Sequence, residues 1–123
     1  MQSVLESIKV GCPGCVAVAI AESATGALVS TVADSPSDHA MLDRAAAVIP
    51  DLFAWLDALD APAPFSDKAE PPGLARLVIA AGPRQLVALR GSEHTLIGLV
   101  PPRAAPLLTR AANALFAPKA TAA

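Results

Sequence analysis

The sequence predicts an α/β fold of the α+β sandwich type, in which a five-stranded antiparallel sheet carries helices on both faces. One long amphipathic pattern, residues 35–59, separates two strand-like apolar runs from three more, and shorter helical patterns stand at both ends. Within each group of runs the turns are short, as they are in hairpins. The predicted order is helix-strand-strand-helix-strand-strand-strand-helix. We expect a single domain over residues 1–117 and a disordered tail over residues 118–123.

The composition limits the kinds of protein that the chain can be. Of its 123 residues, 54% are hydrophobic, which is enough for a core and unlike a disordered protein. Only 3% are aromatic and the net charge is −2, so the platforms and basic surfaces that bind nucleic acid are missing. The start, MQSVLESIKV, is unlike a signal peptide, and no apolar segment is long enough to span a membrane. We expect a cytoplasmic protein with reduced cysteines.

Charge is divided unevenly along the chain. Residues 1–61 carry two Lys or Arg against eight Asp or Glu, whereas residues 62–123 carry seven against three. Such an asymmetry can steer a partner or orient a self-association. Scattered surface charge is the other interpretation, and the sequence leaves both open.

The first part of the chain reads as a helix followed by a hairpin. Residues 2–10 place apolar side chains on one side of a short helix, which Gly11 is suited to end. Residues 15–21 then alternate bulky with small apolar side chains, the pattern of a strand buried on both faces. Gly26 suits the positive φ of a turn, after which residues 27–32 return as the second strand.

The long helix has a clear beginning and one discordant residue. Ser35 is a good N-cap, Pro36 suits the first helical position, and Asp38 completes a pattern like a capping box. Pro50 removes a backbone donor and crowds the carbonyl four residues earlier, so we expect a kink or a break there.

This helix is more apolar than a helix on a single sheet requires. One stripe about 120° wide would cover its own sheet, and a second shoulder widens the apolar arc to about 180°. The surplus predicts a second contact surface, such as a partner's copy of the same helix. The stripe consists of Met41, Ala45, Val48, Ile49, Leu52, Trp55, Leu56 and Leu59, and the shoulder of Leu42, Ala46 and Phe53.

The second part of the chain reads as a linker, a meander and a final helix. Residues 60–73 contain four prolines, which stiffen a linker without marking a domain boundary. Gly82-Pro83 suits a type II′ turn, and Gly91-Ser92 suits the next turn. The predicted elements are strands 74–81, 84–90 and 94–100 and a helix from Pro101-Pro102 to about Ala117.

Over about residues 2–117 the chain resembles the Roadblock family, that is, the dynein light chain Roadblock and its bacterial relatives. The order of elements is the family's order. The matching features are Pro13-Gly14 before an apolar strand, Gly26 in the first turn, the long helix, and the closing meander LVIAAGPRQLVALRGSEHTLIGLV. The proline-rich linker and Pro50 depart from the family pattern.

The resemblance implies a dimer, either of this chain with itself or with a paralogous Roadblock-like chain. The third strands of two copies would pair and the long helices would pack together. It also implies a non-enzymatic adaptor, without cofactor or metal, that binds or regulates a Ras-like small GTPase or scaffolds a signalling or motor complex. The expected interface residues are Met41, Leu42, Ala45, Ala46, Ile49, Leu52, Phe53, Leu56, Arg76, Val78 and Ala80.

Cys12-Pro13-Gly14-Cys15 offers an alternative function. A C-x-x-C pair exchanges dithiols when a helix N-terminus lowers the pKa of its first thiol, but this pair follows a helix and precedes a strand. We therefore favour two small apolar residues around a turn over a small-molecule or thiol-redox sensor. Zinc would need about four ligands, and His39 and His94 lie far along the chain from the cysteines. A structural subunit of a larger assembly is a third hypothesis.

Overall fold

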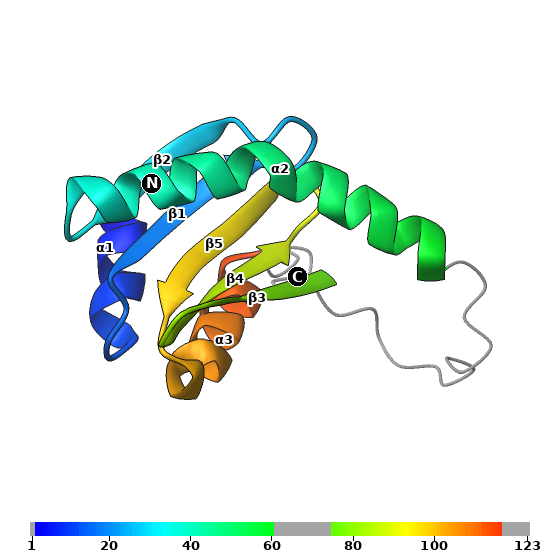
Figure 1. Ribbon diagram of the computed structural model, residues 1–123. Coiled ribbons are helices and arrows are strands. Elements are labelled where there is room, and N and C mark those ends of the chain that lie inside the picture. Colours follow the sequence, from blue (N-terminus) through cyan, green and yellow to red (C-terminus); the bar gives the residue numbers. More distant parts are fainter. Residues whose placement is uncertain (1, 61–74, 117–123) are drawn as a thin grey trace.

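The computed structural model describes residues 2–60 and 75–116, which form one antiparallel sheet between two helical layers (Figure 1). This architecture confirms the predicted fold class and order of elements. In chain order the elements are α1 (Gln2–Gly11), β1 (Ala17–Glu22), β2 (Leu28–Ala33), α2 (Pro36–Asp60), β3 (Ala75–Ala81), β4 (Arg84–Arg90), β5 (His94–Val100), the 3₁₀ turn η1 (Pro102–Ala104) and α3 (Ala105–Leu115).

Some predicted boundaries differ from the observed ones. The first strand begins at Ala17 rather than Cys15, because the Cys15 amide donates to the Cys12 carbonyl and closes a turn. The second strand is shifted by one residue, and the final helix divides into η1 and α3. The predicted linker after Asp60 and the predicted tail lie outside the described residues.

The sheet has the strand order β2-β1-β5-β4-β3, with every neighbouring pair antiparallel. The two halves of the chain meet where β1 pairs with β5, in a register that places Ala17 opposite Leu99. Strands β2 and β3 form the two edges. The β2 edge adjoins α1, because the Gln2 side chain donates to the Thr31 carbonyl at 3.2 Å and accepts from the Ser30 hydroxyl at 2.6 Å.

The two faces of the sheet bury side chains of different size. On one face α1 and α3 pack against bulky residues such as Val18 and Ile20 of β1. On the other face α2 packs against the small residues of the same strand, Ala17, Ala19 and Ala21. The alternation of bulky and small residues in β1 thus determines which helical layer covers each face.

Helix α2 continues through Pro50, so of the predicted kink or break the break does not occur. The Ser35 hydroxyl accepts a hydrogen bond from the Asp38 amide at 3.2 Å, which confirms the predicted N-cap. Because Pro50 has no N–H, it cannot donate to the carbonyl of Ala46. The turn at Gly26 (φ 80°) packs against this carbonyl so closely that a Cβ on Gly26 would stand 2.2 Å from its oxygen.

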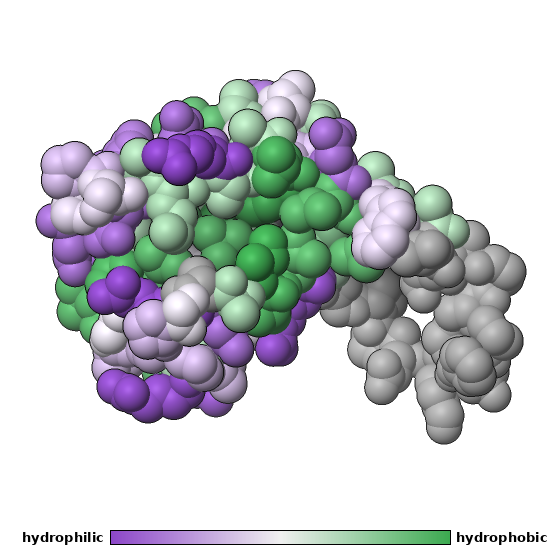
Figure 2. Space-filling model, in the orientation of Figure 1, coloured by the Kyte–Doolittle hydropathy of each residue, from purple (hydrophilic) through white to green (hydrophobic). Residues whose placement is uncertain are grey.

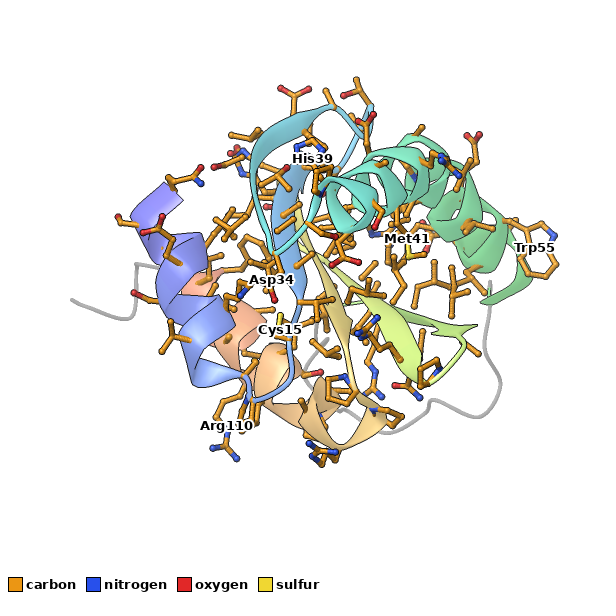
Figure 3. The ribbon with its side chains drawn as sticks, turned by 60° about the vertical axis from the view of Figure 1, so that its left-hand side comes forward. Cys15, Asp34, His39, Met41, Trp55 and Arg110 are labelled. Atoms are coloured by element: carbon orange, nitrogen blue, oxygen red, sulfur yellow. The ribbon has the colours of Figure 1, made fainter. Side chains whose placement is uncertain are left out.

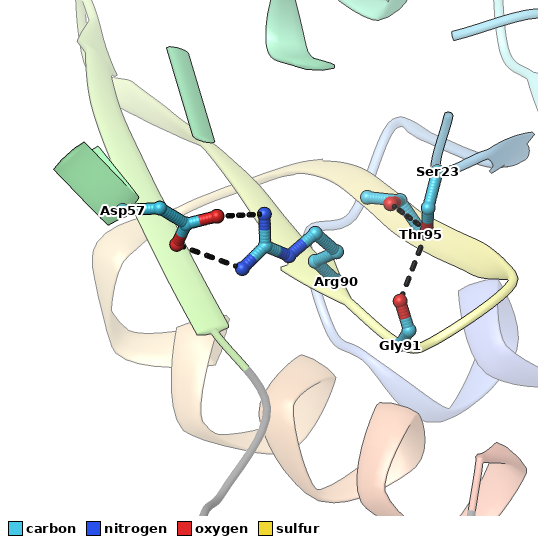
Figure 4. Close-up of polar contacts among 5 residues, drawn as sticks. All are labelled: Ser23, Asp57, Arg90, Gly91 and Thr95. Carbon is cyan, nitrogen blue, oxygen red and sulfur yellow. Dashed lines mark hydrogen bonds and ion pairs between the residues drawn. The ribbon is translucent and has the colours of Figure 1, made fainter. Parts of the chain in front are cut away.

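Polar side-chain contacts join α2 to β4, and the first hairpin to the turn between β4 and β5 (Figure 4). Arg90 of β4 donates two hydrogen bonds to the Asp57 carboxylate, at 2.9 and 3.0 Å, and its guanidinium lies 4.7 Å from the ring centroid of Phe53. These hydrogen bonds lower the pKa of Asp57, so the pair stabilises the fold above the unfolded carboxyl's pKa and loses this effect as the pH falls through the lowered value. The Ser23 hydroxyl contacts the Gly91 carbonyl and the Thr95 hydroxyl.

Among residues 2–60 and 75–116, none of the helices combines the length and the hydropathy needed to cross a bilayer.

Replacing Gly26 by Ala should destabilise the fold more than replacing Gly82 by Ala. Both glycines have positive φ, so each substitution carries backbone strain of about 1 kcal/mol. At Gly26 the new methyl group would also clash with α2, whereas at Gly82 nothing lies within 4 Å. We expect Gly26→Ala to cost a further 1–3 kcal/mol, roughly the cost of overpacking, in urea denaturation at one protein concentration. Equal losses for the two variants would contradict this packing of the turn against α2.

Candidate functional site

One flank of α2 presents large apolar side chains to solvent. Met41, Val48 and Trp55 are 43%, 51% and 61% exposed. They recur every seven residues, which is almost two helical turns, and so form a single stripe along the helix. Figure 3 shows Met41 and Trp55 at well-separated points along α2. An exposed apolar stripe of this length is typical of a contact surface.

The orientation of α2 differs from the one expected from the sequence. Leu42 and Phe53, assigned to the outward shoulder, are 0% and 2% exposed and face the sheet together with Ala46 and Ile49. These four residues therefore belong to the core of the single chain and are not accessible to a partner. Ala45, Leu52 and Leu56 are half-buried between the core and the exposed stripe. Apolar residues occupy both the predicted stripe and the predicted shoulder, so periodicity alone could not determine which of these two surfaces meets the sheet.

Strand β3 forms an open edge of the same sheet. Among the described elements it packs extensively only with β4, in a register that pairs Val78 with Val87 and Ile79 with Leu86. Ile79 lies on the face that carries α2, Val78 lies on the opposite face, and both are partly exposed. The expected interface residues Arg76 and Ala80 are exposed and share the face of Val78. An uncovered edge strand is a template for pairing with another strand.

The exposed flank of α2 and the adjoining sheet form one apolar area. Figure 2 shows hydrophobic residues gathered over α2 and the sheet beside it, with hydrophilic residues around them. The last turns of α2 project beyond the sheet (Figure 1). These turns carry Trp55. The apolar area therefore extends from the stripe of α2 onto the sheet beside it.

Solved structures share this architecture at low sequence identity. A Roadblock/LC7 domain from Streptomyces avermitilis matches with a TM-score of 0.70 and 17% identity, over 94% of this chain and 91% of that one. Myxococcus xanthus MglB matches with a TM-score of 0.65 and 16% identity, over 94% and 90%. A structure described as MglB with a tetrameric arrangement matches with a TM-score of 0.63 and 18% identity, over 92% and 82%. The chain has a Roadblock fold.

The fold alone does not fix what this Roadblock-like domain binds. Profilin II from Acanthamoeba castellanii also matches, with a TM-score of 0.56 and 20% identity over 94% of this chain and 95% of that one. No family model matches the sequence, and no curated protein matches it.

The two cysteines of the Roadblock-like domain are almost completely buried, although Cys12 also lies in the wall of an open groove between α1 and α3. Cys12 and Cys15 are 3% and 6% exposed and are free thiols. Burial raises the pKa of both, and that of Cys15 reaches about 11. The Cys15 thiol also donates to the Ala17 carbonyl at 3.4 Å. A redox pair needs a lowered pKa and access to solvent, so this geometry favours the packing role.

The histidines do not join the cysteines. His39 is exposed in the first turn of α2, and His94 begins β5. Within the described ranges, no three His, Cys, Asp or Glu side chains are grouped as metal ligands.

The native thiols should react slowly with a soluble thiol reagent at pH 7 to 8. A thiol with a raised pKa holds little thiolate at this pH, and Cys12 and Cys15 expose only 3% and 6% of their surface to the reagent. We expect labelling of Cys12 and Cys15 to be at least about 100-fold slower in buffer than in denaturant, as followed by mass spectrometry. Rapid labelling of the folded chain would restore the thiol-redox alternative.

Proposed function

We propose that this chain is a non-catalytic dimerisation module that regulates a Ras-like small GTPase or holds one in a larger complex. The observation that carries the proposal is the exposed stripe of α2 beside the free edge of β3. The partner in the dimer is a second copy or a paralogous chain of the same fold.

The free edge of β3 suits antiparallel pairing with its own copy. If the two-fold axis passes through Val78, Arg76 of one copy stands opposite Ala80 of the other. This register keeps the two Arg76 side chains apart, whereas a two-fold axis through Arg76 would place like charges directly opposite each other. Backbone hydrogen bonds would then join the two sheets, as they do when a strand is added to a sheet edge.

Helix α2 gives the same pairing its hydrophobic component. In the single chain, the exposed side chains of Met41, Val48 and Trp55 belong to neither hydrophobic core cluster. A second α2 beside the first would remove this stripe from water, and burial stabilises by about 25 cal/mol for each Å² of apolar surface. Tryptophan is also enriched among the few residues that contribute most of the binding energy of a protein–protein interface.

The similar structures support self-association at the level of the fold. One of them is described as MglB with a tetrameric arrangement. The GTPase in the proposal comes from the resemblance of the element order, the turns and the meander to the Roadblock family. Because the chain itself is proposed to perform no catalysis, its effect on a GTPase would come from binding.

Single charges on the exposed stripe should dissociate the dimer without unfolding the chain. We expect light scattering on a size-exclusion column to give about twice 12.4 kDa for the parent chain and about 12.4 kDa for Val48→Asp and Trp55→Asp. Val10→Asp, at a residue that is 85% exposed on α1, is the matched control and should remain dimeric.

A monomeric parent chain, or a dimer that persists in both variants, would contradict the proposed dimer. Circular dichroism should be unchanged in all three variants, because each replaced side chain is exposed in the single chain. By contrast, Leu42→Asp or Phe53→Asp would bury a charge in the core and would report on folding rather than on the interface.

The immobilised chain should retain a Ras-like GTPase from a lysate of its source organism. Retention should depend on whether the GTPase carries GDP or a GTP analogue. The lysate is loaded in parallel with GDP or a non-hydrolysable GTP analogue, and bound proteins are identified by mass spectrometry. Trp55→Asp should retain less GTPase than Val10→Asp if binding requires the dimer. Absence of any GTPase in both nucleotide states, with only structural proteins retained, would contradict regulation and favour a structural subunit.

A further inference from the structure

An apolar groove lies on the face of the sheet opposite α2, between the two terminal helices. Its volume is about 570 Å³, within the range of protein binding sites. The groove is open to solvent, and its lining is predominantly apolar. Its walls include Val4, Ile8, Leu107, Ala111, Ala114 and Leu115.

Arg110 is the one charged residue among those that line the groove. Figure 3 shows its side chain pointing outward from the chain near α1. The acid of α1, Glu6, follows Val4 by two residues and so points about 160° away from it around the helix. Lys9 is engaged in an ion pair with Asp34. The groove is therefore apolar with an isolated positive charge at its rim.

The shape of the groove selects among possible occupants. Helices α1 and α3 have 10 and 11 residues, which corresponds to walls of roughly 15–16 Å. A third helix of about three turns fits this length, and the small side chains of Ala111 and Ala114 allow its backbone to approach α3. No aromatic residue is among those that line the groove, whereas sites for proline-rich segments are lined by aromatic residues. A small ligand would remain largely exposed in so open a site.

We propose that the α1–α3 groove binds an amphipathic helix of a partner protein. Its aliphatic side chains, spaced i, i+3 or i+4, and i+7, pack between the walls, and a carboxylate on its flank pairs with Arg110. This site is separate from the proposed dimer surface, because α2 covers the opposite face of the sheet. Each surface can therefore be occupied without the other.

The test uses two labelled, helix-stapled peptides of about 12 residues with the same leucine face. One carries glutamate on its flanks and the other carries lysine at the same positions. Fluorescence anisotropy with the full chain should show binding of the glutamate peptide about fivefold tighter than of the lysine peptide. Arg110→Glu should reverse this preference, and Ala114→Glu should weaken the glutamate peptide at least about tenfold.

Arg103→Glu is the matched control, because Arg103 is exposed on η1 and does not line the groove. It should change neither affinity by more than about twofold. Equal binding of both peptides, or no effect of Arg110→Glu, would overturn the proposal. If decanoate displaces the glutamate peptide at a concentration lower than that of the peptide itself, the proposal is overturned in favour of a lipid-like ligand. Self-association that Arg110→Glu abolishes would overturn it in favour of a second copy.

Discussion

The packing of α2 on the alanine face of β1 determines how much of this chain remains available for partners. Ala17, Ala19 and Ala21 leave room beneath the helix, and the side chains of Leu42 and Phe53 extend into that room. Their burial fixes the rotation of α2 about its own axis. The stripe of Met41, Val48 and Trp55 must then face solvent, because it lies on another side of the helix.

The same packing explains how a proline is accommodated inside a long helix. Pro50 leaves the Ala46 carbonyl without its usual helical donor, and the first hairpin turn lies against this carbonyl through a glycine. Beyond this point Arg90 reaches from β4 to Asp57 and lies over Phe53. The helix is therefore held by the first hairpin turn and by β4, and its last turns project past the sheet edge.

Much of the fold could be predicted from the sequence, because local chemistry encodes it. The Ser35 cap, the glycines with positive φ and the alternating strands each specify their own element. The rotation of α2 about its own axis was not predictable, because both the predicted stripe, with Val48, and the predicted shoulder, with Leu42, are apolar. Choosing between these two surfaces requires the shape of the opposing sheet, which is a tertiary property.

The candidate site was predictable only in part for the same reason. Strand β3 and several α2 residues could be assigned to an interface by resemblance, yet four of the assigned residues lie in the core. The groove between α1 and α3 could not be read from either helix alone, since each presents an ordinary amphipathic pattern. It exists only where α1 and α3 lie side by side on one face of the sheet.

The most direct test of the claim that the α2 stripe is an interface is the fluorescence of Trp55, the single tryptophan of the chain. In the single chain its side chain is 61% exposed, so a partner that covers the stripe would remove it from water. We expect blue-shifted emission at high protein concentration and a shift to the red on dilution, parallel to the loss of the dimer. Red emission that is independent of concentration would contradict an interface at the α2 stripe.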